Sequence, residues 1–357
     1  MPSHTTPPAP PALSPQANDT PYDGLTPEAV LDALDSVDLR GDGRLLQLNS
    51  YENRVFQVFL EDGRVVVPKF YRPGRWSDAQ ILEEHAFATE LLEQEIPVVA
   101  PWMLTSASRG EVAPSTLASF DVAGHPYRFS VTERRSGRAP ELEDPATLEW
   151  LGRFIGRMHA VGHRRPFEHR LTLDVQTYGI GPRDWLLASS LIPLDAESQW
   201  KQAVDAVLAE VQRCFDAAGG YRPIRLHGDC HSGNVLWTEA GPHFVDLDDA
   251  LTGPAVQDLW MLLPGDPVAM RPQLNALLSG YEDFMEFDWR ELRLIEALRT
   301  LRMIHYSAWI ARRWNDPAFP VAFPWFGDRA YWNEQTTRLM DQLDLMQQQP
   351  ASSGLPY

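Results

Sequence analysis

The chain has 357 residues, long enough for two packed lobes, and its apolar and charged fractions of 44% and 22% are those of a globular protein. Its formal net charge of −18 argues against a general affinity for nucleic acids or anionic membranes. The same charge is compatible with a cationic substrate or with an acidic surface that serves solubility alone.

Several common features of exported proteins are missing from the sequence. The two cysteines, Cys214 and Cys230, lie far apart and do not indicate a disulfide framework. The N-terminus has neither the basic start nor the apolar core of a signal peptide, and no apolar run reaches membrane-spanning length. We therefore expect a cytoplasmic protein.

Both ends of the chain have a composition that disfavours a packed core. Residues 1–24 are rich in Pro, Ala and Ser, and residues 347–357 are similar, so both segments are predicted to be disordered. From Leu45 onward the pattern changes to β-rich runs. Two of these runs meet at Asp62-Gly63, which is a hairpin signal.

A helix and two more strands complete the first predicted lobe. A capping-box pattern beginning at Ser77 predicts a helix over 77–95, because a helical stripe of apolar residues follows it. Strands are predicted at 119–122 and 127–132, separated by a short turn. Together these elements predict a nucleotide-binding lobe over 25–134.

Helical patterns dominate the rest of the chain. A second, larger lobe is predicted over 135–346, and its composition makes the fold class α+β. The clearest helical segments in it are Leu148–Val161, Ser198–Ala218, Asn275–Phe284 and Leu292–Arg312.

The motif LHGDCHSGN in the second lobe carries the strongest chemical signal. Asp229 and Asn234 are five residues apart, the spacing that kinase catalytic loops use for a carboxylate facing the acceptor hydroxyl and an amide that binds magnesium. Asp246 follows an apolar run that predicts one strand of a short hairpin, with Val235-Leu236-Trp237 as the other. Such a hairpin brings the three oxygen donors together, and magnesium prefers hard oxygen ligands.

Two other interpretations of this motif are possible. The polar residues could form a turn that only satisfies local backbone groups. Alternatively, His227, Cys230 and His231 could bind zinc, but the glycines disfavour a helix that would align the histidines, and no further Cys or His pair completes a tetrahedral set. His227 is instead predicted to hold the loop by a local hydrogen bond.

A cation and an acid in the first lobe fit a phosphate site. Lys69 ends a β-rich run, and Glu84 lies on the predicted helix 77–95 on a side that can face the sheet, whereas Glu83 would point elsewhere. Pro68 removes a strand amide and predicts an edge or bulged position. The alternative is that Lys69 and Glu84 are ordinary surface charges.

The segment between the first two strands and a later aspartate complete the candidates. Residues 48–54 contain no GxGxxG, but a turn built on Asn and Ser, including Ser50, can offer amides and a hydroxyl to phosphate oxygens. It could also be a plain hairpin turn. Asp258, in the run GPAVQDLWMLL, is predicted to cap a helix or to brace the catalytic loop without taking part in chemistry.

These motifs resemble known kinases. LHGDCHSGNVLW followed by FVDLDDA is similar to the HGD-x4-N and aspartate pattern of aminoglycoside-phosphotransferase-like kinases. LNSYENRVFQV, KFYRPGRWSDAQILEEHAF and TYGIGPRDWLLASSLIP resemble the bacterial stress response kinase A family more closely. The resemblance covers about residues 25–345 and implies a bilobal protein-kinase-like fold, with a small antiparallel β-sheet lobe carrying one helix and a larger helical lobe.

The resemblance also implies an activity and its catalytic residues. It implies ATP- and Mg²⁺-dependent phosphorylation of serine or threonine hydroxyls in protein substrates, autophosphorylation, and a role in envelope and oxidative stress. Asp229 matches the catalytic aspartate. Asn234 and Asp246 match the metal ligands, and Asp246 is also treated as an active-site residue.

The remaining matches lie in the first lobe, and three departures accompany them. Ser50 matches an ATP-contacting serine, while Lys69 and Glu84 match the lysine–glutamate pair. Pro68 precedes the lysine, Gly228 stands where eukaryotic protein kinases have arginine, and no APE-like activation segment follows the metal-binding aspartate.

The sequence is also compatible with two alternative functions. A small-molecule kinase acting on an aminoglycoside, choline, homoserine or another amino alcohol would suit the aromatic-rich stretch 305–332, although helix packing also explains those rings. A nucleotide-binding regulator without catalysis would be expected to lack one of Lys69, Asp229, Asn234 and Asp246, and all four are present. We expect a monomer that binds neither nucleic acid nor membrane.

Overall fold

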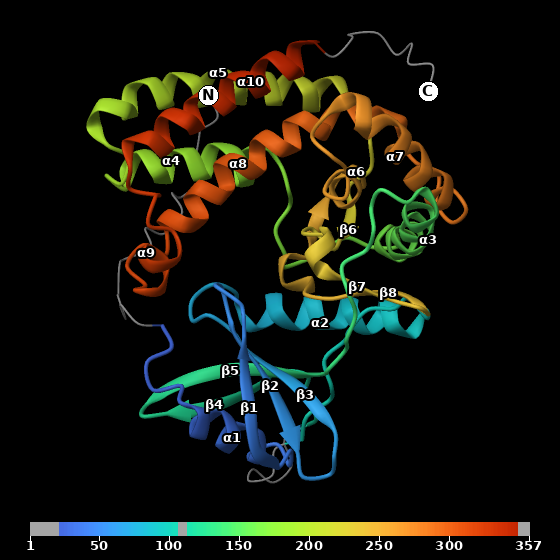
Figure 1. The fold of residues 1–357 in the computed structure, drawn as a ribbon, viewed down its shortest axis with the longest axis vertical. Coiled ribbons are helices and arrows are strands. Elements are labelled where there is room, and N and C mark those ends of the chain that lie inside the picture. Colours follow the sequence, from blue (N-terminus) through green and yellow to red (C-terminus); the bar gives the residue numbers. More distant parts are fainter. Residues whose placement is uncertain (1–20, 106–112, 349–357) are drawn as a thin grey trace, which may run out of the picture.

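The computed structural model describes residues 21–105 and 113–348. It has a small part built on a five-stranded antiparallel sheet and a larger, mainly helical part, which confirms the predicted α+β arrangement (Figure 1). Most of the two ends predicted to be disordered lies outside the described residues. The exceptions are residues 21–24, which form a turn, and residues 347–348, which end the last helix.

The sheet of the small part has the strand order β1-β2-β3-β5-β4. The hairpin predicted at Asp62-Gly63 joins β2 to β3. A helix that the sequence patterns did not predict, α1 (Pro27–Asp35), contributes Val30 and Leu34 to the core of this part. The strands are β1 (Gly41–Leu48), β2 (Arg54–Leu60), β3 (Val65–Phe70), β4 (Ala118–Val122) and β5 (His125–Glu133).

The prediction that Pro68 marks an edge or bulge is wrong. Strand β3 lies in the middle of the sheet, and Pro68 is in regular antiparallel register with Val131 of β5. On the other side of β3, the register pairs with β2 include Lys69 and Val66 but skip Pro68. The sheet therefore accommodates the missing amide as a local interruption of one ladder.

Helix α2 (Asp78–Glu93) packs on the larger part although it lies between two strands of the small sheet in the chain. Its start is the predicted capping box, with Ser77 and Gln80 bonded reciprocally. Its apolar residues, including Phe87 and Leu91, belong to the hydrophobic core of the larger part, which is separate from the core of the sheet. Figure 1 shows α2 lying between the two parts.

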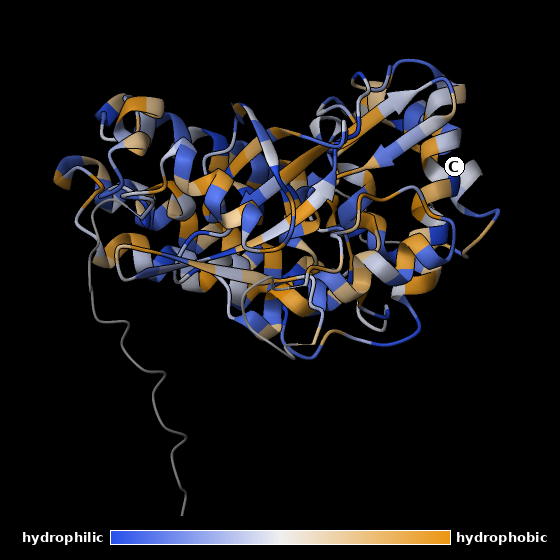
Figure 2. Ribbon diagram, turned by 90° about the horizontal axis from the view of Figure 1, so that it is seen from below, coloured by the Kyte–Doolittle hydropathy of each residue, from blue (hydrophilic) through white to orange (hydrophobic). Residues whose placement is uncertain are grey.

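The four helices predicted in the larger part are present with shifted bounds, and several short helices and the last long helix were not predicted. Hydrophobic and hydrophilic positions alternate along these elements, as expected where one face of each is buried (Figure 2). The helices are α3 (Pro145–Gly162), α4 (Gly181–Ala188), which continues a π-helical turn (Gln176–Ile180), α5 (Leu194–Ala217), α6 (Val256–Trp260), α7 (Pro267–Tyr281), α8 (Ile295–Ala311), which continues a 3-10 turn (Trp289–Leu294), α9 (Ala318–Ala322) and α10 (Arg329–Gln348).

Two small antiparallel pairs of strands frame the predicted catalytic motif. The strands β6 (Ile224–Leu226) and β9 (Leu251–Gly253) pair with each other on either side of the segment 227–250. The hairpin of β7 (Val235–Thr238) and β8 (Gly241–Phe244) follows Asn234 and precedes Asp246, as predicted. In the described ranges, no helix is both long enough and apolar enough to cross a bilayer.

Side chains of α2 bind backbone groups of the larger part. The carboxylate of Glu83 accepts hydrogen bonds from the amides of Glu168, His169 and Arg170 at 2.5, 2.8 and 2.9 Å. Glu83 thus points away from the phosphate site, as predicted. These charge-assisted bonds fix α2 to the segment that precedes α4.

We expect Glu83→Ala to lower the free energy of unfolding by about 2 kcal/mol, because three amides lose a charged acceptor. Urea denaturation monitored by circular dichroism measures this. Glu93→Ala, at an exposed position on the same helix, is the control and should change the value by less than about 0.5 kcal/mol. Equal effects of the two substitutions would contradict the proposed anchoring.

Candidate active site

The loop that carries Asp229 is held from behind by a buried carboxylate. Asp258, which is fully buried on α6, accepts hydrogen bonds from the amides of His227 and Gly228, both at 2.8 Å. It also contacts the ring of His159 on α3 at 3.0 Å. This confirms the predicted bracing role of Asp258, and the cost of leaving a buried carboxylate unpaired makes the arrangement strongly preferred.

Gly228 has a conformation and a position that only glycine fits. Its φ is +84°, and a Cβ atom there would lie 2.2 Å from the carbonyl oxygen of Asp249. An arginine, which eukaryotic protein kinases have at this position, would clash here with the backbone of Asp249. The neighbouring His227 contacts the carbonyl of Val245 through Nε2 at 3.0 Å, which confirms its predicted local role.

The zinc interpretation finds no support in the geometry. In the parts of the chain that the structure describes, no group of three His, Cys, Asp or Glu side chains is arranged to hold a metal ion. Cys230 is completely buried, and burial raises the pKa of its thiol well above the usual value. His231 accepts a hydrogen bond from Gly233 through Nδ1 at 2.9 Å, so its Nε2 carries the proton.

Asp229 is surrounded by donors that favour its ionised form. Its Oδ1 accepts from Nη1 of Arg302 on α8 at 2.6 Å, and its Oδ2 lies 3.4 Å from Nε2 of His231. Asn234 donates to the main-chain oxygen of Asp229 at 2.9 Å. Burial raises the pKa of Asp229, but the hydrogen bond from His231 and the charge of Arg302 outweigh it and hold the pKa well below its usual value.

Lys69 reaches across from the sheet to the acids that follow β8. Its Nζ lies 2.9 Å from Oδ1 of Asp246 and 3.0 Å from Oδ1 of Asp248. Burial lowers the pKa of Lys69, but the two carboxylates raise it well above its usual value. Asp246 has a left-handed backbone conformation, φ +60°, which turns its side chain at the end of the hairpin.

The lysine–glutamate pair that the resemblance implies, Lys69 and Glu84, is not joined by a direct ion pair in the described part of the chain. Both residues line the same cavity, but no ion pair joins them among the described residues, because Lys69 is held by Asp246 and Asp248. Glu84 is buried, and burial raises its pKa to about 7 even though Lys69 and Arg170 lower it. Glu84 therefore acts on Lys69 through its charge and not through a direct ion pair.

Asp248 and Arg75 are site residues that the sequence patterns missed. Asp248 is 3% exposed and accepts a hydrogen bond from Asn53 at 3.1 Å. Arg75 forms ion pairs with both Asp248 and Asp249. The run DLDD that contains Asp248 was visible in the sequence, but no local pattern distinguishes which of its acids is buried, and no local pattern pairs Arg75 with it.

All six predicted site residues line one cavity of about 610 Å³ between the two parts. Ser50 lies at its edge, where its hydroxyl oxygen accepts a hydrogen bond from the amide of Asn53 at 3.3 Å. The size is within the range of small-ligand and cofactor sites. The predicted residues brought together are Ser50, Lys69, Glu84, Asp229, Asn234 and Asp246.

A second hollow, about 230 Å³ in volume, lies on the α8 side of Asp229. Arg302, His305, Tyr306 and Trp309 line it from one face of α8. Because both hollows share Asp229, a group bound in one can meet a group bound in the other at this carboxylate. The arrangement suits a reaction between two ligands.

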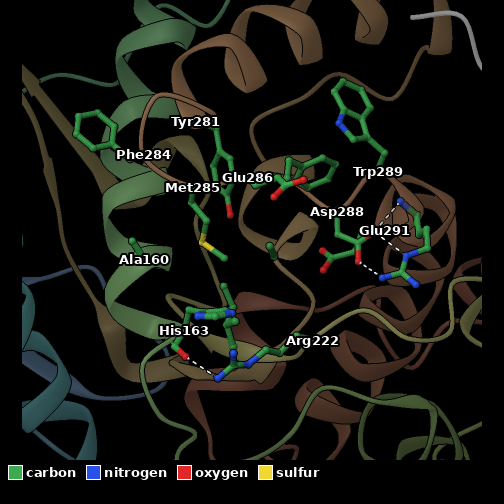
Figure 3. Close-up of a pocket in the computed structure, with 14 residues that line it drawn as sticks. Ala160, His163, Arg222, Tyr281, Phe284, Met285, Glu286, Asp288, Trp289 and Glu291 are labelled. Carbon is green, nitrogen blue, oxygen red and sulfur yellow. Dashed lines mark hydrogen bonds and ion pairs between the residues drawn. The ribbon is translucent and has the colours of Figure 1, made fainter.

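Another hollow, about 780 Å³ in volume, lies elsewhere, between the ends of α3 and α7 and the segment 284–291 (Figure 3). None of the predicted site residues is among its lining residues. Glu291 there accepts a hydrogen bond from the amide of Val256 at 2.8 Å, and burial raises the pKa of Glu291 to about 8. This side chain supports the start of α6, which carries Asp258.

Comparison with known proteins agrees with this geometry. Residues 44–295 match the model of a family described as "Phosphotransferase enzyme family". The chain is 44% identical to stress response kinase A of Escherichia coli (strain K12) over 329 residues, which cover 92% of this chain and 96% of the relative. The chain belongs to the stress response kinase A group of the phosphotransferase enzyme family. The predicted family is thereby confirmed.

One more relative and two solved structures of other proteins agree with this family and with the fold. Serine/threonine protein kinase RdoA of Salmonella typhimurium (strain LT2) is 43% identical over 92% of this chain and 96% of its own length. Amicoumacin kinase hAmiN, solved in complex with AMP-PNP and Ca²⁺, superposes with a TM-score of 0.68 at 19% identity over 91% and 95% of the two chains. A microcompartment-associated aminopropanol kinase gives a TM-score of 0.65 at 18% identity over 90% and 96%. The predicted kinase-like fold is confirmed.

The contact between Arg302 and Asp229 leads to a pH-dependent prediction. A carboxyl whose pKa is lowered by folding contributes stability above its unfolded pKa and loses that contribution as the pH falls. We expect Arg302→Gln to lower the free energy of unfolding by about 1 kcal/mol near pH 7, since the guanidinium is partly exposed. The difference from the original protein should shrink as the pH falls below about 4.

Urea denaturation between about pH 2 and pH 7 measures this difference, because the low end of the range must approach the lowered pKa of Asp229. Arg338→Gln is the control, because Arg338 pairs with Glu334 at an exposed site on α10 and should contribute little at any pH. A difference for Arg302→Gln that stays constant over the whole range would show that its effect does not pass through the ionisation of Asp229.

Proposed function

We propose that the protein is an ATP- and Mg²⁺-dependent kinase that phosphorylates serine or threonine hydroxyls of proteins, itself included, in a bacterial stress response. The observation that carries this proposal is the position of Lys69, which reaches from the sheet to Asp246 beside Asp229 and Asn234. The name of the relative serine/threonine protein kinase RdoA favours a protein acceptor.

The donors at the end of the hairpin fit a magnesium ion with a nucleotide. Asp246 is more than half exposed to the cavity, and its only cation partner among the described residues is Lys69. The side-chain amide nitrogen of Asn234 donates a hydrogen bond to the main-chain oxygen of Asp229, so its side-chain oxygen is available to bind a metal. Asn234 and Asp246 would hold Mg²⁺, which supplies neutralisation of the phosphate charge when bound.

The residues of the chain have distinct tasks in this proposal. Ionised Asp229 accepts a hydrogen bond from the acceptor hydroxyl and directs its oxygen toward the nucleotide cavity. Lys69 orients the phosphates, and Asn234 and Asp258 fix the backbone around Asp229. Positioning and electrostatic stabilisation, not a strongly basic side chain, would supply most of the rate enhancement.

We expect Asp229→Ala to lower the rate of phosphoryl transfer by about a thousandfold or more, because the acceptor loses its hydrogen-bond partner, while nucleotide binding remains. Transfer of labelled phosphate and calorimetric titration with ATP measure the two properties. Asp341→Ala, at an exposed position on α10, is the control with the same loss of charge. Full transfer by Asp229→Ala would refute the assignment.

We expect Asp246→Ala to weaken binding of Mg-ATP by about tenfold or more, because the metal loses a carboxylate ligand. The same titration without magnesium should show a much smaller loss. This comparison separates the loss of a metal ligand from a general distortion of the cavity. Unchanged Mg-ATP affinity in Asp246→Ala would count against the proposed metal site.

A small-molecule acceptor is the second candidate. It is favoured by the small size of the 230 Å³ hollow and by its aromatic walls, which include Tyr178, Tyr306 and Trp309. Amicoumacin kinase and aminopropanol kinase, the structural neighbours, are named for small acceptors. Labelled ATP offered with a Ser/Thr-containing protein and, separately, with a panel of amino alcohols distinguishes the two. Transfer to an amino alcohol alone would replace the protein-kinase proposal.

A further inference from the structure

The loop between β1 and β2 is bound to the larger part through one buried carboxylate. Glu52 accepts a hydrogen bond from Nε1 of Trp309 on α8 at 2.6 Å and forms an ion pair with Arg313, which follows α8, at 2.5 Å. A second cation, Arg72, two residues after β3, contacts its other oxygen at 3.0 Å. The side chains of Glu52, Arg72 and Arg313 are only 10–13% exposed.

Arg72 extends the connection to the backbone of the same loop. Its guanidinium donates to the carbonyl oxygens of Tyr51 and Glu52 at 3.2 and 3.1 Å. It also pairs with Asp316 of the larger part at 2.7 Å. A planar guanidinium with several donors suits this task, because one side chain fixes two carbonyls and a carboxylate at once.

An aromatic contact covers this group of charges. The ring of Tyr51 lies 5.1 Å from that of Phe323 and 6.5 Å from that of Phe319. Trp309 packs against both phenylalanines as well. The tip of the loop is therefore held to the larger part by a buried ion pair and by apolar contacts together.

Glu52 is ionised in this environment. Burial raises its pKa, but the charges of Arg75, Arg313 and Arg72 outweigh the effect of burial and lower the pKa. A buried carboxylate is stable only while such partners remain, so loss of one partner leaves an uncompensated charge. The contacts of Glu52 therefore resist separation of the loop from α8.

The loop contains no GxGxxG motif. Its conformation is fixed by side-chain contacts, whereas glycine-rich nucleotide-binding loops depend on the backbone conformations that glycine allows. It carries Ser50 at the edge of the 610 Å³ cavity, and Glu52 and Trp309 line both this cavity and the smaller hollow beside Asp229. Any movement of the loop that opens the cavity must break the contacts of Glu52 with Trp309 and Arg313.

We propose that Glu52 is a positioning residue that latches the phosphate-binding loop onto the end of α8 and thereby sets the rate at which nucleotide leaves. The inference rests on the proposed nucleotide-binding function. It gives Trp309 and Arg313 a task outside the chemistry, since they hold the loop and do not contact the reacting atoms. It also links the acceptor hollow to the nucleotide cavity, because Trp309 is a wall of both.

The test measures dissociation of a fluorescent ADP analogue, with Mg²⁺, after mixing with excess unlabelled ADP. We expect Glu52→Gln and Arg313→Gln each to increase the dissociation rate about tenfold, as expected for loss of a charge-assisted hydrogen bond. The double variant should dissociate no faster than about the faster single variant, because both substitutions break the same contact.

Arg312→Gln is the matched control. Arg312 precedes Arg313 in the chain, but its guanidinium lies over the ring of Trp185, 5.7 Å from the ring centroid, and it forms no ion pair with Glu52 among the described residues. It loses the same charge and should leave the dissociation rate unchanged. Trp309→Phe keeps an aromatic ring against Phe319 and Phe323 and removes the N–H donor, so it tests the latch if the charge variants are too unstable to purify.

The outcomes separate the inference from the proposed function. Dissociation rates in Glu52→Gln, Arg313→Gln and Trp309→Phe equal to those of the original protein and of Arg312→Gln would overturn the latch while nucleotide binding stands. An equal increase in Arg312→Gln would also overturn it. Failure of the original protein to bind the ADP analogue would overturn the proposed function, and the inference with it.

Discussion

The ion pairs between the sheet and the turn after β8 determine the geometry of the cleft. Asp246, Asp248 and Asp249 lie within four residues of one another, and like charges so close together repel one another unless cations balance them. The cations, Lys69 and Arg75, come from the sheet part. The cleft therefore exists in this form only while the two parts are held together.

The larger part alone holds Asp229 and its neighbouring groups in place. Asp258 holds the loop of Asp229 from behind, and α2, with Glu84, packs into the core of the larger part. The sheet contributes Lys69, Arg75 and the loop around Ser50. A relative movement of the two parts would thus change the contacts of these three elements and leave the surroundings of Asp229 intact.

Features determined by a few neighbouring residues could be predicted from the sequence. The turn at Asp62-Gly63, the capping box at Ser77 and the short hairpin beside Asn234 are all of this kind. The errors concern partners that are distant in the chain. Lys69 contacts Asp246, 177 positions away, and no local pattern shows that it prefers this acid to Glu84. Likewise, the central position of β3 depends on pairing with β5, which Pro68 alone does not reveal.

The net charge of −18 does not describe the cleft, since its aspartates Asp229, Asp246, Asp248 and Asp249 already have cation partners. Arg75 pairs with Asp249, and Arg302 pairs with Asp229. A cationic acceptor would therefore compete with arginines for these acids. On the proposed function, Lys69 would leave Asp246 for the phosphates of a bound nucleotide, and the carboxylate would then face the metal. Asp248 would remain as the partner of Lys69, so the ammonium would be redirected without becoming an unpaired buried charge.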